Sequence, residues 1–454
     1  MKRFISTIQN IFRIEDLKSK LLITLICILV YRFGSHVVLP GVDPNQLDNL
    51  KSQTAGGIFG LLDMFAGGAF SSASIFALGI MPYISASIIV QLLTMALPAF
   101  QKLQKEGESG RKKLSQWTRM LTVVVCLFQA PGYLVNLNSQ APLAIISNTN
   151  PEALSPFMFN LISVIIITAG TLFVMWLGEK IQERGIGNGT SLIIMVGIIA
   201  RLPMALTGEF SRCMTTGSGS ILMFIVEMVL WLLVIGSVIL LVQGTRKIPV
   251  QFAKTIVGNR QYGGVRQYIP LKVNTAGVMP IIFAQAIMFI PATIAQFFPE
   301  HQSWQGAISA FTNSNSIWYN VVFALLIIVF TYFYTAIAVN PNQMADDMKK
   351  NNGFIPGIKP GRKTAEFIDE VMSRITLPGA IFLAFVAILP AFASLIGINQ
   401  NFASFYGGTS LLIMVGVILD TLQQIESQLL MRKYDGLMKS GRIKGRSTMS
   451  AVPQ

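Results

Sequence analysis

Charged residues are scarce in this chain. Asp, Glu, Lys and Arg make up 12% of its 454 residues, against about 25% in an ordinary soluble domain. Hydrophobic residues make up 52%, and the mean hydropathy is +0.58. So few charges leave too little polar surface to cover a soluble protein of this size. The composition excludes a soluble multidomain protein, a disordered chain and a collagen-like chain, and it favours a polytopic membrane protein.

Cysteine and histidine are scarcer still. Cys27 and Cys126 lie inside apolar runs, where a thiol is most simply a small hydrophobic group, and Cys213 stands alone in a predicted loop. These positions predict neither a disulfide framework nor a metal site. The two histidines, His36 and His301, are far apart and lack a neighbouring ligand pattern, which argues against histidine catalysis. We therefore expect no enzyme activity and no cofactor.

Long apolar runs are abundant. A bilayer core needs about 20 mostly apolar residues per helix. Runs of this kind predict ten transmembrane helices and an all-α fold. They cover roughly Leu21–Val38, Ile75–Leu97, Trp117–Leu137, Pro156–Leu177, Thr190–Leu206, Ile221–Val242, Val278–Phe298, Ile317–Val339, Leu377–Ile396 and Thr409–Ile425.

Positive charge is concentrated in alternate loops. The formal net charge is +14, and the basic residues gather before the first span and after the second, sixth, eighth and tenth. The positive-inside rule then predicts that both termini are cytoplasmic. Five spans on either side of a central loop necessarily have opposite topology, which is the arithmetic of an inverted repeat.

The predicted organisation follows from these spans. An interfacial helix over 1–20 precedes an N-terminal half over 21–206, and an external hinge over 207–220 leads to a C-terminal half over 221–425. Two long basic cytoplasmic loops cover about 244–276 and 340–376, and a cytoplasmic tail covers 426–454. Long connections tend to be functional. Their charge suits anionic lipid or a large acidic partner, either protein or RNA, and charge alone does not separate these.

One short apolar segment stands out before the second span. Phe59–Phe65 is too short to cross a bilayer and is followed by Gly67, Gly68 and a serine-rich link. It is expected to fold back into the protein from the outer side, the alternative being a surface loop with an interfacial helix. In the next span Ile80 and Ile84 are four residues apart and share a helix face, a spacing that ordinary packing also explains.

A second glycine-rich segment, RGIGNG, begins at Arg184. It lacks the pattern of a nucleotide-binding loop and does not follow a strand. A tight turn that permits close helix approach is therefore the favoured interpretation.

Several longer strings point to one family. They are GGAFSSASIFALGIMPYISASIIVQLL, KEGESGRKK, MWLGEKIQERGIGNGTS, PLKVNTAGVMP, YTAIAVNP, PGIKPGRKTAEFID and GGTSLLIMVGV. In content and order they resemble the SecY family, the main subunit of the bacterial Sec protein-conducting channel (the translocon), over nearly the whole chain.

The resemblance implies two five-helix halves forming a clamshell around a pore. It implies a lateral gate between the second and third spans on one side and the seventh and eighth on the other. A short plug helix at about 61–71 would fill the outer funnel, with Leu61, Leu62, Met64, Phe65, Gly67 and Gly68. The pore ring would be Ile80, Ile84, Ile194, Ile282 and Ile413.

The resemblance also implies partners. Lys254, Arg260, Lys359 and Arg362 would lie where the family docks a SecA-type ATPase or the ribosome. A SecE-like small subunit would brace the halves, with a SecG-like subunit as a further partner, and signal sequences, nascent chains and membrane lipid would contact the channel. Lys359 stands where the family usually has Arg, so the charge is kept but the planar fork of donors is lost.

The function implied is passive conduction of unfolded polypeptides across the cytoplasmic (inner) membrane, driven by a partner, with lateral release of transmembrane segments. The alternative is a secondary transporter for a small solute. A coupled transporter usually needs clustered acids within the membrane. Glu227 and Asp420 form no visible relay pattern, and the predicted pore centre is isoleucine.

Overall fold

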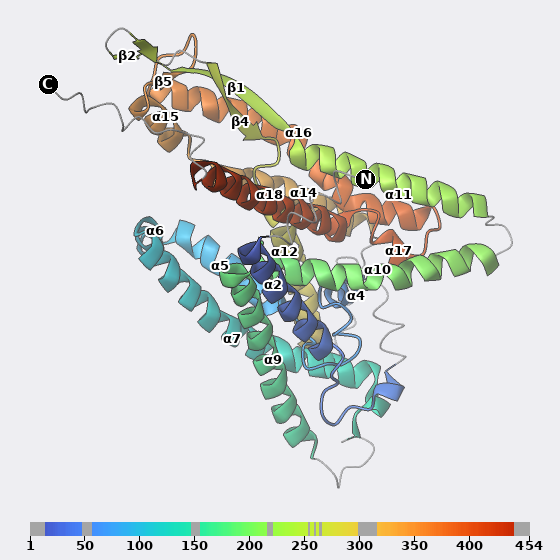
Figure 1. The fold of residues 1–454 in the computed structure, drawn as a ribbon. Helices are drawn as coiled ribbons and strands as arrows, with labels where there is room; N and C mark the ends of the chain where they lie inside the picture. Colours follow the sequence, from blue (N-terminus) through green and yellow to red (C-terminus); the bar gives the residue numbers. More distant parts are fainter. Residues whose placement is uncertain are drawn as a thin grey trace.

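The structure is a computed structural model that describes residues 14–47, 57–146, 155–215, 221–252, 255–257, 260–262, 266–297 and 316–439. Within these ranges helices dominate, and they form two groups that meet along α10 and α18 (Figure 1). The first group contains α2 (Glu15–Gly34), α4 (Gly57–Phe65), α5 (Met81–Ala96), α6 (Pro98–Lys105), α7 (Glu108–Gln140), α9 (Pro156–Arg184) and α10 (Gly189–Thr215), with the short 3-10 helices η1 (Pro44–Gln46) and η2 (Pro142–Ala144).

The second group follows in the chain. Its helices are α11 (Ile221–Gln243), α12 (Met279–Phe297), α14 (Ile317–Ala338), α15 (Pro341–Lys350), α16 (Arg362–Leu395), α17 (Gln400–Ala403) and α18 (Gly408–Lys439). Its strands are β1 (Thr245–Phe252), β2 (Thr255–Val257), β3 (Arg260–Tyr262), β4 (Arg266–Lys272) and β5 (Gly353–Phe354).

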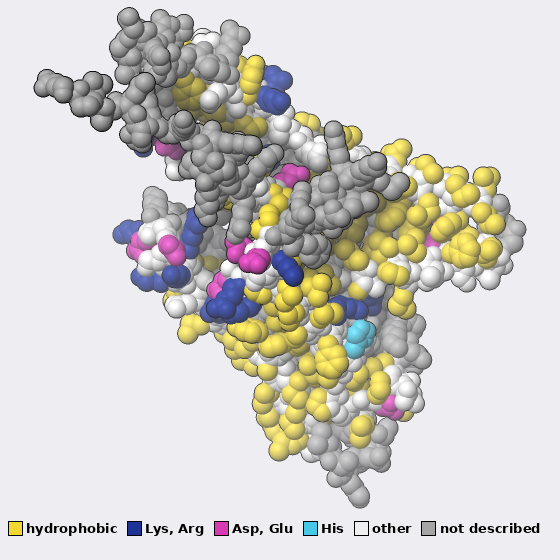
Figure 2. Space-filling model, in the orientation of Figure 1, with side chains coloured by type: hydrophobic (Ala, Val, Ile, Leu, Met, Phe, Trp, Pro, Cys, Tyr) yellow, Lys and Arg dark blue, Asp and Glu magenta, His cyan; other side chains and the backbone are white. Residues whose placement is uncertain are grey.

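The predicted all-α membrane fold is confirmed, and each predicted span has a helix among the described residues. These helices are α2, α5, α7, α9, α10, α11, α12, α14, α16 and α18. Seven helical segments of the described chain are long and apolar enough to cross a membrane by length and composition, and α5 and α12 contain shorter apolar stretches. The visible outer faces of the helices are largely hydrophobic, while Lys and Arg gather near α6 and the start of α7 (Figure 2).

The start of the second span differs from the prediction. Residues 66–80 form turns rather than helix, and α5 begins only at Met81. The predicted plug helix over about 61–71 is also wrong in its bounds, because the described helix is Gly57–Phe65. The cause is local: Gly67 (φ 65°) and Gly68 (φ 90°) adopt left-handed backbone conformations, which end the helix.

A small β-sheet was missing from the prediction. The two basic segments predicted as loops combine in an antiparallel sheet of order β4-β1-β5, with Ile248 opposite Ile269. Ile248, Val250 and Leu271 from this sheet pack with Ile368 of α16, which extends well before the predicted span. Alternating side chains thus give the two segments one shared hydrophobic core.

The glycine-rich turn joins the two halves at one end of the α10–α18 contact. Gly187 (φ 84°) donates its backbone N–H to Oε1 of Gln424 in α18 at 2.9 Å. Ile186 donates its backbone N–H to the Thr24 hydroxyl at 3.2 Å. The tight-turn interpretation of this motif is confirmed.

Candidate functional site

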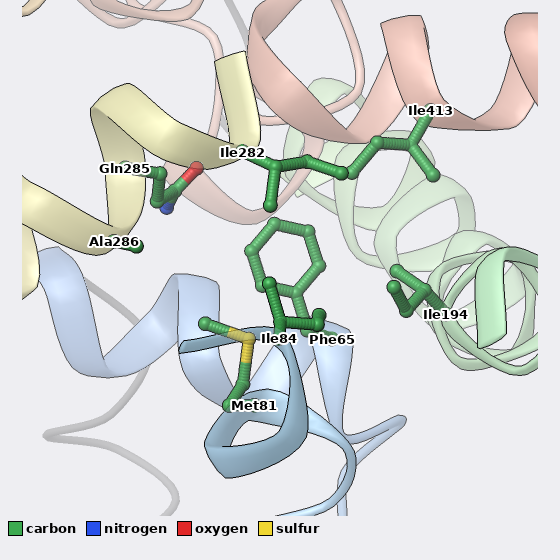
Figure 3. A pocket seen from close by; sticks show the side chains of 8 residues that line it. All are labelled: Phe65, Met81, Ile84, Ile194, Ile282, Gln285, Ala286 and Ile413. Carbon is green, nitrogen blue, oxygen red and sulfur yellow. The ribbon is translucent and has the colours of Figure 1, made fainter. Parts of the chain in front are cut away.

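A narrow apolar constriction lies where the two halves meet. Four of the five predicted ring isoleucines line it, together with a plug side chain (Figure 3). The space between the lining atoms is about 290 Å³, of which only about 10 Å³ admits the centre of a water molecule. The lining residues are Phe65, Met81, Ile84, Ile194, Ile282, Gln285, Ala286 and Ile413.

Both halves contribute to the constriction. Ile84 comes from α5 and Ile194 from α10, whereas Ile282 comes from α12 and Ile413 from α18. A buried water needs roughly 10–15 Å³ and two to four polar partners. The lining offers one polar side chain, Gln285, so a water held here lacks its partners. The geometry therefore fits a constriction that stays dry when it is empty.

Ile80 departs from the predicted ring. It lies one residue before α5, is 2% exposed and packs in the same hydrophobic core as Ile194 and Ile413, but it is not among the residues that line the constriction. Ile80 is the N-cap of α5, and its carbonyl accepts the backbone N–H of Ile84 at 3.1 Å, so the two residues stand one helical turn apart, yet only Ile84 is in the lining. Met81 occupies the neighbouring place in the lining.

The plug fills the constriction from one side. Phe65, the last residue of α4, points its ring among the isoleucines (Figure 3). Leu62, Met64 and Phe65 are all buried, and the Ser410 hydroxyl of α18 donates to the Met64 sulfur at 2.8 Å. The side chain of Leu61 lies outside the described residues. The plug thus touches both halves of the molecule.

A buried ion pair holds the plug. The Asp63 carboxylate is fully buried and pairs with Arg201 of α10. Its other oxygen accepts the backbone N–H of Ser71 at 2.8 Å, and Arg201 also donates to the Ser71 hydroxyl at 3.1 Å. We call Asp63, Ser71 and Arg201 the plug anchor.

Sequence reasoning missed the plug anchor. Its signal was present: one acid in the short apolar segment and one arginine inside an apolar span, both costly in a membrane unless they meet.

Three further contacts fix the turns after α4. The Tyr31 hydroxyl donates to the carbonyl of Ala66 at 3.1 Å, and Arg32 donates to the carbonyl of Gly67 at 2.8 Å. The Tyr133 hydroxyl of α7 donates to the carbonyl of Phe70 at 2.9 Å. Backbone carbonyls that are not paired in a helix are thereby satisfied away from water.

The α10 helix approaches the plug closely at Gly197. A Cβ atom there would stand 2.8 Å from the carbonyl oxygen of Phe65 and 3.1 Å from the nitrogen of Gly67. Only glycine permits this approach without displacement of the plug.

A second cavity lies among α5, α12 and α14. Its volume between atoms is about 740 Å³, and its walls mix aromatic, aliphatic and polar side chains. Nearby, α7 of the first half packs against α12 of the second. These are the helices that the family resemblance predicts for a lateral gate. The lining residues are Gln91, Leu92, Thr94, Phe283, Phe333, Tyr334, Ile337 and Ala338.

Two of the four predicted docking residues have side chains among the described residues. Lys359 and Arg362 are exposed beside the small sheet, and Arg362 pairs with Glu366 at 3.1 Å. Arg260 lies in β3, although its side chain is outside the described residues, and Lys254 lies outside them entirely. The structure therefore brings two of the four predicted residues onto one exposed surface.

The two intramembrane acids lie apart from the constriction. Asp420 is exposed on α18, and Glu227 is buried in α11 near Arg212. Neither contributes to the lining of the constriction, where no charged side chain occurs among the described residues. This arrangement gives no support to a coupled transporter.

The fold resembles that of solved channels. It matches "The structure of a protein conducting channel" with a TM-score of 0.63 and 17% identity, covering 96% of this chain and 95% of that chain. It also matches Sec61 in the canine ribosome-channel complex from the endoplasmic reticulum, with a TM-score of 0.61 and 17% identity over the same shares of both chains. Two helical halves that meet at a plugged apolar constriction thus give this chain the fold of these protein-conducting channel structures.

Sequence comparison gives the family. The SecY family model matches residues 74–422. The protein translocase subunit SecY of Streptomyces galbus is 44% identical over 433 residues, covering 94% of this chain and 98% of that protein. The chain belongs to the SecY family.

Proposed function

We propose that this chain is the central subunit of a channel that passes unfolded polypeptides across the cytoplasmic membrane. The observation that carries the proposal is the constriction of isoleucines blocked by Phe65. A conduit for unfolded chains must pass every kind of side chain, so strong binding groups in the narrowest part would stall it. Branched apolar side chains exclude ions when the pore is idle and yield to any peptide without specific bonds.

Opening requires the plug to leave. The plug anchor and the three hydrogen bonds to the turns after α4 hold it at rest. Gly67 and Gly68, next to the anchor, have the conformational freedom that a swinging segment needs. Separation of α7 from α12 would connect the constriction to the lipid and release transmembrane segments sideways. The mixed lining of the cavity among α5, α12 and α14 suits an apolar segment in transit.

The energy for transport comes from partners. A SecA-type ATPase or a ribosome docks on the exposed basic surface around Lys359 and Arg362. The likeness to Sec61 in a ribosome-channel complex supports the ribosome as one such partner. A SecE-like subunit braces the halves, and a SecG-like subunit completes a three-subunit complex. Signal sequences and nascent chains occupy the pore, and membrane lipid surrounds it.

Both termini face the cytoplasm in this proposal. Ser139, at the end of α7, is exposed on the outer side, whereas Lys112 is 76% exposed at the cytoplasmic start of the same helix. In a variant without Cys27, Cys126 and Cys213, a cysteine at Ser139 is labelled from outside intact cells, and one at Lys112 only after the membrane is opened. Labelling of both positions from the same side contradicts the orientation.

Cross-linking of a stalled substrate tests the proposal directly. Ile282→Cys places a thiol in the lining of the constriction, while Leu325→Cys places one on an exposed face of α14. A polypeptide arrested during translocation, carrying one cysteine at the arrest point, is expected to form a disulfide with position 282 and not with 325. Cross-linking at 325 alone, with efficient translocation, overturns this pore assignment.

A further inference from the structure

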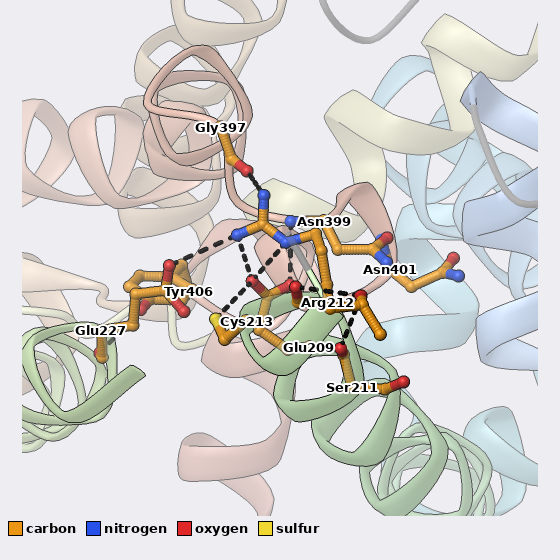
Figure 4. Close-up of polar contacts among 10 residues, drawn as sticks. Glu209, Ser211, Arg212, Cys213, Glu227, Gly397, Asn399, Asn401 and Tyr406 are labelled. Atoms are coloured by element: carbon orange, nitrogen blue, oxygen red, sulfur yellow. Dashed lines mark hydrogen bonds and ion pairs between the residues drawn. The ribbon is translucent and has the colours of Figure 1, made fainter. Parts of the chain in front are cut away.

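A buried ionic cluster joins the two halves at the end of α10. Glu209 and Arg212 belong to α10, and Glu227 belongs to α11 (Figure 4). Glu209 is fully buried and Glu227 is 2% exposed. We call Glu209, Arg212 and Glu227 the hinge clasp. Glu209 and Arg212 lie within the predicted external hinge over 207–220; the structure corrects this prediction, and that of a loop at Cys213, because residues 207–215 are the last turns of α10, while residues 216–220 are outside the described residues.

The hinge clasp contacts the second half at three separate points. Arg212 holds Glu209 with two nitrogens, its Nε at 2.8 Å from Oε1, and lies 3.5 Å from Oε1 of Glu227. Arg212 also donates to the carbonyl of Gly397, and Oε2 of Glu209 accepts the backbone N–H of Asn399 at 2.9 Å. One guanidinium therefore ties α10 to α11 and to the segment 397–406 (Figure 4).

The guanidinium of Arg212 is the positive charge that faces the two buried carboxylates of the hinge clasp. Two carboxylates are buried within reach of one another, and Oε2 of Glu227 has no hydrogen-bond partner among the described residues. The Cys213 sulfur also lies within 4.8 Å of both acids, a set that could hold a metal ion. Arg212 already contacts both carboxylates, so one positive charge of the protein is shared between them and offsets part of their negative charge. Without it, buried negative charges would face each other unpaired.

We call the plug and the constriction together the seal. Both elements joined by the hinge clasp continue into residues that line the constriction or contact the plug. One of them, α10, carries Ile194 of the constriction, Gly197 against the plug and Arg201 of the plug anchor. The other, the segment 397–406, runs into α18, whose Ser410 holds Met64 of the plug and whose Ile413 lines the constriction.

The segment 397–406 is itself fixed to α11. Trp231 donates to the carbonyl of Phe405 at 2.8 Å, and the Tyr406 hydroxyl donates to the carbonyl of Glu227 at 2.6 Å. A displacement at the clasp would thus be passed to the start of α18.

We propose that Arg212 is a positioning residue of the seal: through Glu209, Glu227 and the segment 397–406 it sets α10 against α18 and so keeps the plug and the isoleucines in register. The inference rests on the proposed channel function and adds a control point remote from the pore. Loosening the clasp lets the halves shift and unseats the plug without any change in the constriction itself.

Idle conductance of the purified complex in planar bilayers, without substrate, tests the proposal. Arg212→Gln is expected to raise the current about tenfold, less than the full loss of a buried ion pair would give, because Trp231 and Tyr406 still fix the segment 397–406 to α11. Arg212→Lys keeps the charge but not the fork of donors and gives a smaller rise, of about threefold. The matched control is Arg374→Gln, which breaks the exposed pair with Glu370 in α16 and leaves the current at the wild-type level.

The outcomes separate the inference from the proposed function. A wild-type complex that passes substrate, together with an Arg212→Gln complex as ion-tight as wild type, overturns the clasp and leaves the channel function standing. If Arg212→Gln does not accumulate, Arg212→Lys decides, and wild-type tightness in that variant overturns the clasp. A leak in Arg374→Gln equal to that in Arg212→Gln also overturns it. A wild-type complex that passes no substrate is a failure of the proposed function.

Discussion

The plug anchor and the proposed docking surface around Lys359 and Arg362 both contain an arginine paired with an acid, in opposite settings. Asp63 is fully buried and its partner Arg201 is 28% exposed, whereas Arg362 is 92% exposed and Glu366 61% exposed. An exposed pair contributes about 0–1 kcal/mol and its charges stay available to a partner. A buried pair strongly penalises the loss of either member and therefore fixes a structure. Burial thus separates a pair that holds the plug from one that can receive a partner.

Removal of the buried acid is expected to give the largest effect. Asp63→Asn leaves Arg201 without its counter-charge beside the plug, and loss of one partner of a buried pair typically costs about 3–5 kcal/mol. The plug is then displaced, and the idle ion current measured in planar bilayers rises roughly a hundredfold. Asp347→Asn, which removes an exposed acid near Lys350, is the control and stays tight. A tight Asp63→Asn channel would show that the anchor does not hold the plug.

A single methyl group tests the close approach of α10 to the plug. Gly197→Ala puts a Cβ 2.8 Å from the carbonyl oxygen of Phe65, so the plug must shift. We expect an idle current about tenfold above wild type, below that of Asp63→Asn, because the anchor still holds. Gly208→Ala on the same helix meets nothing within 4 Å and serves as the control. Equal currents in the two variants contradict the proposed contact.

Exposed charges are expected to act on partner binding and not on the seal. Lys359→Glu and Arg362→Glu should each lower partner-driven translocation several-fold, with a stronger effect at low salt, because charge reversal weakens an electrostatic contact. Arg260→Glu is expected to behave in the same way. Idle conductance should not change in any of them.

Two variants calibrate this prediction. Lys359→Arg keeps the charge and should transport normally. Lys112→Glu reverses an exposed charge at the start of α7, away from the sheet, and should also transport normally. Normal transport by Lys359→Glu and Arg362→Glu across a range of salt removes these residues from the docking surface.

The smallest expected effect comes from one plug hydrogen bond. Tyr133→Phe removes the donor to the carbonyl of Phe70, a loss of about 1 kcal/mol. Its leak should be detectable only when combined with Gly197→Ala, in which the plug is already displaced. If the Tyr133→Phe/Gly197→Ala double variant leaks no more than Gly197→Ala alone, this hydrogen bond does not restrain the plug.

The length of the apolar runs predicted the helical architecture from sequence. Ten helices follow the ten predicted apolar runs, because the bilayer forces backbone groups to pair within each segment. The small sheet was not predicted, since one of its pairings joins residues just over a hundred positions apart, Gln251 with Phe354. Helix bounds near the plug also failed, because the sequence does not show which glycines adopt the left-handed conformation that ends α4 at Phe65, as Gly67 and Gly68 do.

The constriction was predictable only in part. The family resemblance identified Ile84, Ile194, Ile282 and Ile413, while spacing alone could not separate a pore from ordinary packing. Phe65 was expected in the plug, but its insertion between the isoleucines depends on where α4 ends. Asp63 and Arg201 of the plug anchor are 138 positions apart along the chain, and Arg212 and Glu227 of the hinge clasp are 15 apart, so no local pattern pairs these charges; only Glu209 and Arg212, three apart on α10, have a helical spacing.

The central claim is that the isoleucines form a dry seal and do not merely pack. Idle conductance of an Ile84→Ser/Ile282→Ser complex, measured beside its thermal melt, tests this most directly. Hydroxyl groups would wet the constriction, so the channel should leak while its melting temperature stays near that of wild type. Ile167→Ser, in the fully buried core of α9, should instead melt earlier, with a large-to-small cost of about 2–5 kcal/mol, and stay tight. A double variant as ion-tight as wild type that melts much earlier would contradict the seal.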